Sequence, residues 1–170
     1  MVWTAPKTWA VDEVLTAADM NTYLRDNTEH LFDRPSDSYE NDLSGNISTT
    51  STVLVAVDAT RYQVSIDSSN HVLVHFHGTV QIGAINNEAN FDIAVDGVLQ
   101  GDSVGGILNA RATVNNYRTP VSFSRLVGPL SPGTHVITLY WSVSAGTLTM
   151  LNQAAGATQS VVGQFWAHEV

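Results

Sequence analysis

Short runs that alternate apolar and polar residues recur from residue 52 to the end of the chain, with turn residues between them. A period of two is typical of strands that bury one face. The longest run, residues 71–82, predicts a strand with one apolar face and one largely polar face. The apolar face would carry Val72, Val74, Phe76, Val80 and Ile82, and the opposite face His71, Leu73, His75, His77, Thr79 and Gln81.

These runs predict roughly eight or nine strands with no helix between them, which favours a mainly β, antiparallel jelly-roll sandwich, with a single barrel as the alternative. Asp96-Gly97 stands between apolar flanks and predicts a type I′ hairpin. A turn at Ala145-Gly146 should lead into a return strand. The predicted strand segments are 52–57, 61–67, 71–82, 90–102, 117–130, 130–151 and 159–170.

One helix is predicted before the strands, over residues 15–31, and it must end before Pro35. Thr16 suits the N-cap position, and Asp19 stands where a capping box places its acidic residue. An isolated helix of about four turns is marginal in water. The helix therefore needs packing partners.

The apolar positions of this helix form a narrow seam. Met20, Leu24, Asn27 and Leu31 follow a 4-3-4 spacing, which is typical of helices that pair with copies of themselves. In such a bundle Asn27 would set the register and the number of copies. The alternative is a helix that packs on its own domain through Met20, Tyr23, Leu24 and Leu31.

The segments on either side of the helix differ in composition. Residues 1–14 carry Trp3 and Trp9, which predict an arm that docks on a neighbouring subunit or another protein or, equally, a flap over its own domain. Residues 33–51 are rich in Asp, Ser, Asn and Thr and predict a linker or extended connector. Their acidic residues lack the spacing of a calcium loop. The expected division is 1–34 for arm and helix, 35–51 for the linker and 52–170 for the β-domain.

Composition narrows the classes of function. The 170 residues are 44% hydrophobic but only 14% charged, with a net charge of −9. Nucleic-acid binding and attachment to anionic membranes are therefore not expected, because few cations are present to meet phosphates. The chain has no cysteine, no signal-peptide pattern and no apolar run long enough to span a membrane. If it works outside a cell, we expect release by lysis or within a particle.

His75 and His77 place two imidazoles about 7 Å apart on one strand face, which is a weak indication of a zinc or nickel site. The sequence identifies no third ligand, so no metal and no cofactor is expected. The alternative is a polar face whose histidines lie in water or between subunits. In the second case assembly would respond to pH near 6 to 7.

No catalytic motif is present, so an enzyme is not expected. Asp92, Asp96 and Asp102 could pair as glycosidase carboxylates, but all three stand at or near turns, where Asp is favoured for backbone reasons. Trp141 should point into the core, whereas Tyr140 and Tyr117 are weak candidates for contact with a ligand. The ligand-binding residues remain unassigned.

Residues 6–27, PKTWAVDEVLTAADMNTYLRDN, resemble the start of many tailed-bacteriophage and prophage virion proteins, in which this stretch precedes a variable C-terminal module. AVDGVLQG (94–101), LSPGTHVITLYWSVSAGTLTM (130–150) and a last strand ending in Glu169 are similar to their trimeric jelly-roll domains, related to the C1q and tumour-necrosis-factor folds. The resemblance implies a virion homotrimer attached through its N-terminal part, with the β-domain facing outward.

These observations together predict a bacteriophage structural protein, a tail-associated homotrimer whose β-domain binds a host surface glycan or protein. The N-terminal arm would contact other virion proteins. The chain would be made in the bacterial cytoplasm and would work on the particle surface. The alternative is a structural role without a receptor, such as capsid decoration or tail assembly, and a soluble glycan-active enzyme ranks third.

Overall fold

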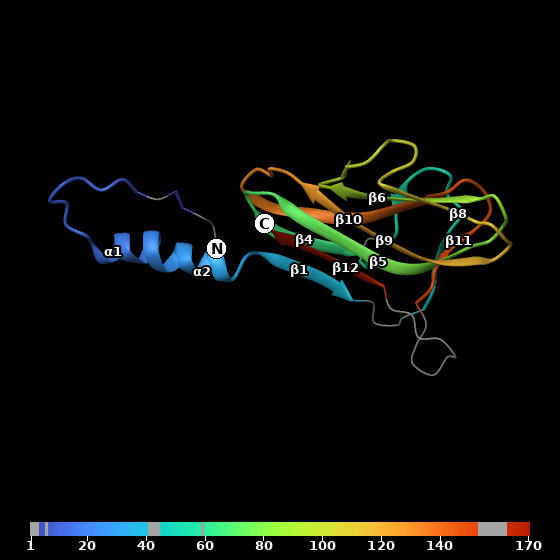
Figure 1. Cartoon of the computed structure of the whole chain (residues 1–170), viewed down its shortest axis with the longest axis horizontal. Coiled ribbons are helices and arrows are strands. Elements are labelled where there is room, and N and C mark those ends of the chain that lie inside the picture. Colours follow the sequence, from blue (N-terminus) through green and yellow to red (C-terminus); the bar gives the residue numbers. More distant parts are fainter. Residues whose placement is uncertain (1–3, 6, 41–44, 59, 153–162) are drawn as a thin grey trace.

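Two antiparallel β-sheets pack face to face to form the body of the molecule, and a helix projects from one end of it (Figure 1). The computed structural model describes residues 4–5, 7–40, 45–58, 60–152 and 163–170. Figure 1 places the helix and the sandwich one after the other along the long axis. The architecture is the jelly-roll sandwich that the alternating pattern predicts.

The helical segment consists of α1 (Ala17–Met20), the π-helical stretch η1 (Asn21–Asp26) and α2 (Asn27–Phe32). Sheet A contains β1 (Ser36–Glu40), β2 (Ile47–Thr49), β5 (Val72–Ile82), β9 (Tyr117–Val127), β11 (Leu148–Met150) and β12 (Gln164–Glu169). Sheet B contains β3 (Val55–Ala56), β4 (Gln63–Ser68), β6 (Glu88–Val95), β7 (Val98–Leu99), β8 (Leu108–Arg111) and β10 (Gly133–Val143).

Strand β5 is the centre of sheet A. It pairs with β9 along its whole length, and along its other edge with β12 and then with β11. Every second residue of β5 is fully buried, which confirms the two faces predicted from its sequence. In sheet B, β10 pairs with β6 on one edge and with β3 and β4 on the other.

The core lies between the two sheets and contains several large aromatic side chains. Trp141 and Leu139 of β10 are buried, as predicted, and Phe76 of β5 stacks on Phe91 of β6 with 6.0 Å between ring centroids. The Asp96-Gly97 turn has φ values of 50° and 81°, and β6 pairs with β7 across it, which confirms the predicted hairpin.

The return strand predicted after Ala145-Gly146 is β11, but it lies in the other sheet. It pairs with β5 and β2 of sheet A, whereas β10 belongs to sheet B. Leu148 and Met150 are fully buried there. The glycine at position 146, with a φ of 71°, indicates the turn correctly. A turn signal does not specify which sheet the next strand joins.

Residues 35–51, predicted as a linker or extended connector, contain strands β1 and β2 in their described part. β1 pairs with β12, and β2 pairs with β11. Both strands lie at the edges of sheet A. An edge strand can pair through its backbone hydrogen bonds although few of its side chains are apolar. Each still contributes a residue that packs on the core, Tyr39 and Ile47. The strand predicted for 52–57 is shorter than expected and is limited to β3.

The helix begins as predicted. The Thr16 hydroxyl accepts a hydrogen bond from the Asp19 amide, and the Asp19 carboxylate accepts one from the Thr16 amide, both at 3.1 Å. The helix ends at Phe32, with Asp33 as its C-cap. Among the described residues, no helix has the length and apolar character needed to cross a membrane.

His135, near the start of β10, is hydrogen-bonded to Asp96 and so links the Asp96-Gly97 hairpin to that strand. The ring is buried, with Nδ1 at 2.7 Å from Asp96 Oδ2 and Nε2 at 2.7 Å from the Ser131 carbonyl oxygen. Both oxygens only accept hydrogen bonds, so the doubly protonated imidazolium satisfies both. The Ser131 carbonyl and the Asp96 carboxylate accordingly raise the pKa of His135 above its usual value.

Tyr39→Ala should lower the free energy of unfolding by about 2 kcal/mol, because it removes a core-packed ring whose centroid lies 5.2 Å from that of Tyr62. Ser38→Ala, at an exposed position of the same strand, should change it by less than about 0.5 kcal/mol. Urea unfolding followed by circular dichroism measures both. Equally small effects would mean that residues 35–51 behave as a linker.

His135→Gln should remove a pH dependence of stability. Because the pKa of His135 is raised by folding, its contribution is complete below the unfolded value of about 6.5 and is lost as pH rises through the folded value. We expect a wild-type loss of about 1 kcal/mol between pH 6 and pH 9, allowing for the half-exposed Asp96. Urea midpoints measure the difference between the two proteins. An identical pH profile would contradict the assignment.

Candidate functional site

The outer face of sheet A is the candidate functional site. It consists of the side chains on β1, β12, β5 and β9 that point away from the core. These residues are Ser36, Ser38, Gln164, Trp166, His168, Leu73, His75, His77, Thr79, Gln81, Arg118, Pro120, Ser122, Ser124 and Leu126. The register places Trp166 opposite His75 and His168 opposite Leu73, so the aromatic side chains of β12 and β5 lie next to one another.

Four rings form a ladder across this face. His75 and Trp166 stack with 5.1 Å between centroids, and Trp166 and His168 stack at 5.0 Å. The His77 ring lies 6.3 Å from that of His75. On the other side His75 Nδ1 lies 2.8 Å from Ser124 Oγ of β9. The two histidines predicted from the sequence therefore belong to a larger aromatic group.

The sequence analysis missed Trp166 and His168 as members of this face. Both follow the period-two pattern of the last strand, since Phe165 and Ala167 point into the core. The signal available in the sequence was therefore the alternation of β12. Its register against β5, which joins the two strands into one aromatic group, depends on tertiary structure.

The electrostatics of the face are set by burial and by the near absence of charge. Burial of the ring lowers the pKa of His75, and repulsion from His77 is a second, smaller cause of the same shift. Asp37 and Glu169 belong to the same strands but point to the opposite side, where they bond to the Ser65 amide and the Ser68 hydroxyl. Among the described side chains of the face, the only permanent charge is Arg118 at one end, held by Gln81; β1 ends with Glu40, which the register places opposite Gln164.

The structure gives no third ligand to the weak metal candidates His75 and His77. Among the residues it describes, no three histidine, aspartate or glutamate side chains are grouped so that they could hold a metal ion. We therefore assign no metal ligand to this face. Its stacked rings and hydroxyl groups are suited to contact with another surface.

Each of the three aspartates considered as catalytic carboxylates accepts hydrogen bonds from backbone amides. Asp92 is fully buried and accepts hydrogen bonds from the amides of Ile93 and Gly101, and burial raises its pKa. Asp96 accepts from the Val136 amide besides bonding His135. The amides of Val104 and Gly105 bond to Asp102 and lower its pKa. Each carboxylate thus stabilises its own turn or loop.

The tyrosines considered as ligand contacts lie apart from the outer face of sheet A. Tyr117 packs against the core at the start of β9. Tyr140 is half-buried on β10, opposite Asp92 in the register of sheet B.

The N-terminal arm folds back on the helix. Asn27 accepts a hydrogen bond from the Thr4 amide at 3.0 Å and donates one to the Thr4 carbonyl oxygen at 2.9 Å, so its amide is buried. Trp9 packs edge-on against Tyr23, and the Lys7 ammonium lies 4.6 Å from the centre of the Trp9 ring. The described part of the arm thus covers its own helix, an arrangement that the sequence analysis did not consider.

The other seam residues stay exposed. Met20, Leu24 and Leu31 are 45%, 55% and 54% exposed, so the helix does not pack on its own sandwich through them. The π-helical stretch η1 also takes more residues per turn than an α-helix, so the 4-3-4 spacing no longer aligns Asn27 with Leu24. The oligomerisation role of the four residues stays a prediction. In the single chain, the side-chain amide of Asn27 is hydrogen-bonded to the backbone of Thr4.

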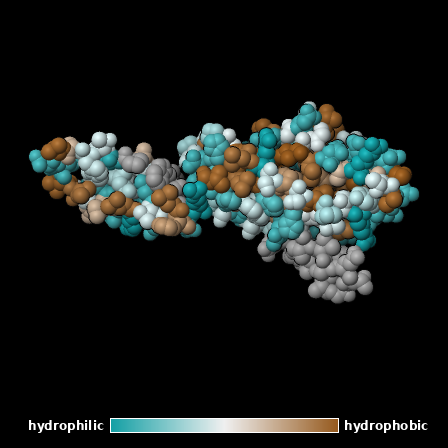
Figure 2. Space-filling model, in the orientation of Figure 1, coloured by the Kyte–Doolittle hydropathy of each residue, from teal (hydrophilic) through white to brown (hydrophobic). Residues whose placement is uncertain are grey.

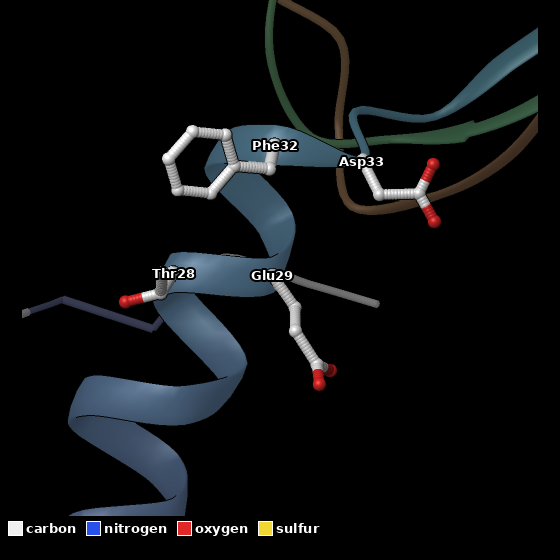
Figure 3. A pocket seen from close by; sticks show the side chains of 4 residues that line it. All are labelled: Thr28, Glu29, Phe32 and Asp33. Atoms are coloured by element: carbon white, nitrogen blue, oxygen red, sulfur yellow. The ribbon is translucent and has the colours of Figure 1, made fainter.

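A hollow at the end of α2 is lined by Thr28, Glu29, Phe32 and Asp33 (Figure 3). In this view the Thr28 and Phe32 side chains lie on one side of the helix, while Glu29 and Asp33 point away from them. Phe32 is 88% exposed, and Figure 2 shows further apolar residues along the helical end of the molecule. The side chains do not converge on one point, so the hollow lacks the geometry of an active site.

No protein-family model matches this chain, and no curated protein matches its sequence. Several solved structures are similar to its fold. Eiger TNF from S. frugiperda is 12% identical, with a TM-score of 0.45 over 81% of this chain and 94% of its own. VP2 of infectious bursal disease virus is 11% identical, with a TM-score of 0.42, over 81% of this chain and 36% of its own. A pentameric capsid protein from metagenomic phage sequences is 15% identical, with a TM-score of 0.27, over 74% and 61%.

Proposed function

We propose that this chain is a structural protein of a bacteriophage virion, a tail-associated homotrimer whose β-domain binds the host surface. The N-terminal arm and helix join the trimer to other virion proteins. The sandwich carries the contact with a glycan or protein of the host. Three weak sites on one assembly would bind a surface more firmly than a single site, because the second and third contacts form at high effective concentration.

The observation that carries the proposal is the composition of the outer face of sheet A. The chain has 16 acidic residues and a net charge of −9, so contact between copies over most of its surface would bring like charges together. The described side chains of this face are uncharged apart from Arg118, and β1 ends with Glu40, which the register places opposite Gln164. Copies could therefore approach one another over the described part of this face at little of that cost, and the ring ladder of His75, His77, Trp166 and His168 offers aromatic area for the contact.

The helical end supports the attachment role. Met20, Leu24, Leu31 and Phe32 expose apolar side chains on a segment that projects from the sandwich (Figure 1). Apolar residues grouped on a projecting element are typical of a surface that other chains cover. The resemblance of residues 6–27 to the N-terminal segments of tailed-phage proteins favours the same role.

Light scattering on the full chain tests the assembly. We expect a molar mass of three times the 18.3 kDa of one chain. Ser122→Glu, which adds an acidic side chain to an exposed position of the outer face of sheet A, should weaken the trimer at least tenfold. Val98→Glu, at a 64% exposed position of sheet B, is the matched control and should leave the mass unchanged. A monomeric wild-type protein would contradict the proposal.

Binding of the trimer to an array of bacterial lipopolysaccharides and capsular polysaccharides tests the receptor role. We expect binding that weakens at least tenfold when Ser122→Glu dissociates the trimer, because multivalency is lost. A stable trimer that binds none of these glycans, and no intact bacterial cells, would favour the structural role without a receptor. Release of shortened polysaccharide would favour an enzyme.

A further inference from the structure

Three loops meet at the end of the sandwich that lies opposite the helix (Figure 1). They connect β5 with β6, β8 with β9 and β10 with β11, so each of them crosses from one sheet to the other. Together with the adjoining strand ends they comprise residues 81–88, 111–118 and 143–148, and we call this surface the apex.

Hydrogen bonds hold the three loops of the apex to one another. The Gly83 amide donates to the Thr147 carbonyl oxygen at 2.9 Å, and the Asn116 amide donates to the Gly83 carbonyl oxygen at 3.0 Å. The side-chain amide of Asn87 donates to the Ala145 carbonyl oxygen at 2.6 Å. Loops that a rigid scaffold holds in this way can present their side chains to a ligand in a fixed arrangement.

Two exposed asparagines of the apex use their side-chain oxygens within these loops. Asn115 Oδ1 accepts a hydrogen bond from the Ile85 amide at 3.0 Å, and Asn86 Oδ1 accepts one from the Arg111 guanidinium at 3.3 Å. A backbone amide and a guanidinium can only donate, so the oxygen of each asparagine must face them. Among the described residues, no acceptor bonds to the NH2 group of either side chain.

A third exposed asparagine is oriented through a chain of side chains that starts on β9. Arg118 Nε donates to Gln81 Oε1 at 2.9 Å, so Gln81 uses its amide nitrogen to donate to Asn116 Oδ1 at 3.4 Å. Because the guanidinium can only donate, it sets the orientation of both amides. In the described part of the chain, the NH2 group of Asn116 likewise bonds to no acceptor.

The apex also differs in charge from the chain as a whole. It contains two basic residues, Arg111 and Arg118, and one acidic residue, Glu88, whereas the whole chain has 7 basic and 16 acidic residues. Both arginines are exposed. The register places Glu88 opposite Arg111, yet the structure describes no ion pair for Arg111. The apex thus presents cations and NH2 donors on an otherwise acidic molecule.

From this arrangement, and resting on the host-binding role proposed above, we infer that the apex binds an anionic polysaccharide through the carboxylate and hydroxyl oxygens of its uronic acid units. The donors are the NH2 groups of Asn86, Asn115 and Asn116 and the guanidinium groups of Arg111 and Arg118. A surface that mainly donates hydrogen bonds selects a ligand that mainly accepts them. A guanidinium also matches the planar geometry of a carboxylate.

Two apolar side chains and the net charge of the chain favour the same assignment. Ile85 and Val114 of the apex are 50% and 55% exposed and can contact the C–H groups of sugar rings. The net charge of −9 repels an anionic cell surface over most of the molecule. The apex has more cations than acidic groups and lies away from the helical end, so it can approach such a surface first.

The test is binding of the full chain to immobilised capsular polysaccharides of known composition, some with uronic acid units and some neutral. We expect binding only to polysaccharides with uronic acids. Chemical reduction of their carboxylates to alcohols should weaken it at least about tenfold. Binding that is confined to neutral polysaccharides, or that survives this reduction, would overturn the inference but leave the host-binding role in place. A chain that binds no polysaccharide and no bacterial cells would contradict both.

The apex lies within one chain, which separates this test from that of the assembly. A monomeric protein should bind the same polysaccharides, with lower avidity than a trimer. Loss of the trimer therefore does not remove the expected preference for uronic acids.

Single substitutions assign the binding to the apex. Asn115→Asp keeps the oxygen that accepts from the Ile85 amide but replaces the NH2 donor with an anionic oxygen, and it should weaken binding at least about tenfold. Arg111→Gln removes one cation and should weaken binding at least about fivefold.

Two variants elsewhere control for the change of charge. Val98→Glu adds one negative charge at a 64% exposed position of β7, and Arg25→Gln removes one positive charge from the helical segment. Both should bind as the wild type does. Circular dichroism and light scattering identify the variants that keep the wild-type fold and mass. Unchanged binding by Asn115→Asp and Arg111→Gln, or an equal loss in the two controls, would overturn the assignment.

Discussion

The register of β5 is the constraint on which the rest of the sandwich depends. This strand pairs with β9 over all of its length and with β12 and β11 along its other edge, so it fixes how three other strands are placed. Its side chains alternate strictly between the core and the outer face. A shift by one residue would place Phe76 on the outside and His75 and His77 between the sheets. The cost of burying two imidazoles without partners selects the observed register.

That alternation is the reason why so much of the sandwich could be predicted from the sequence. The faces of β5, the burial of Trp141, the Asp96-Gly97 hairpin and the Thr16 cap follow from patterns only a few residues long. Other features depend on partners that are distant in the sequence. β1 is a strand because β12 lies beside it more than a hundred residues later, and β11 joins sheet A although β10 ends in sheet B. Local composition does not contain these pairings.

The candidate site shows the same limit. His75 and His77 could be identified as neighbours because they lie two residues apart on one strand. Trp166 joins them through the register between β5 and β12. Asn27 illustrates the opposite case. Its place in a 4-3-4 spacing suggested a contact between helices, yet its amide bonds to Thr4, which lies in a segment without a regular pattern, and η1 interrupts the helical period on which the prediction relied.

The connection between the helix and β1 has a mechanical consequence. Only residues 33–35 separate the end of α2 from the start of β1, and β1 pairs with β12 over five positions. A protein held by its N-terminal part and pulled by its β-domain would carry tension directly along β1. Antiparallel hydrogen bonds lie across the strands, so a pull along β1 loads all of its bonds to β12 together in shear and does not open them one after another. This strand, which lies in the segment predicted as a linker, is thus placed to resist force.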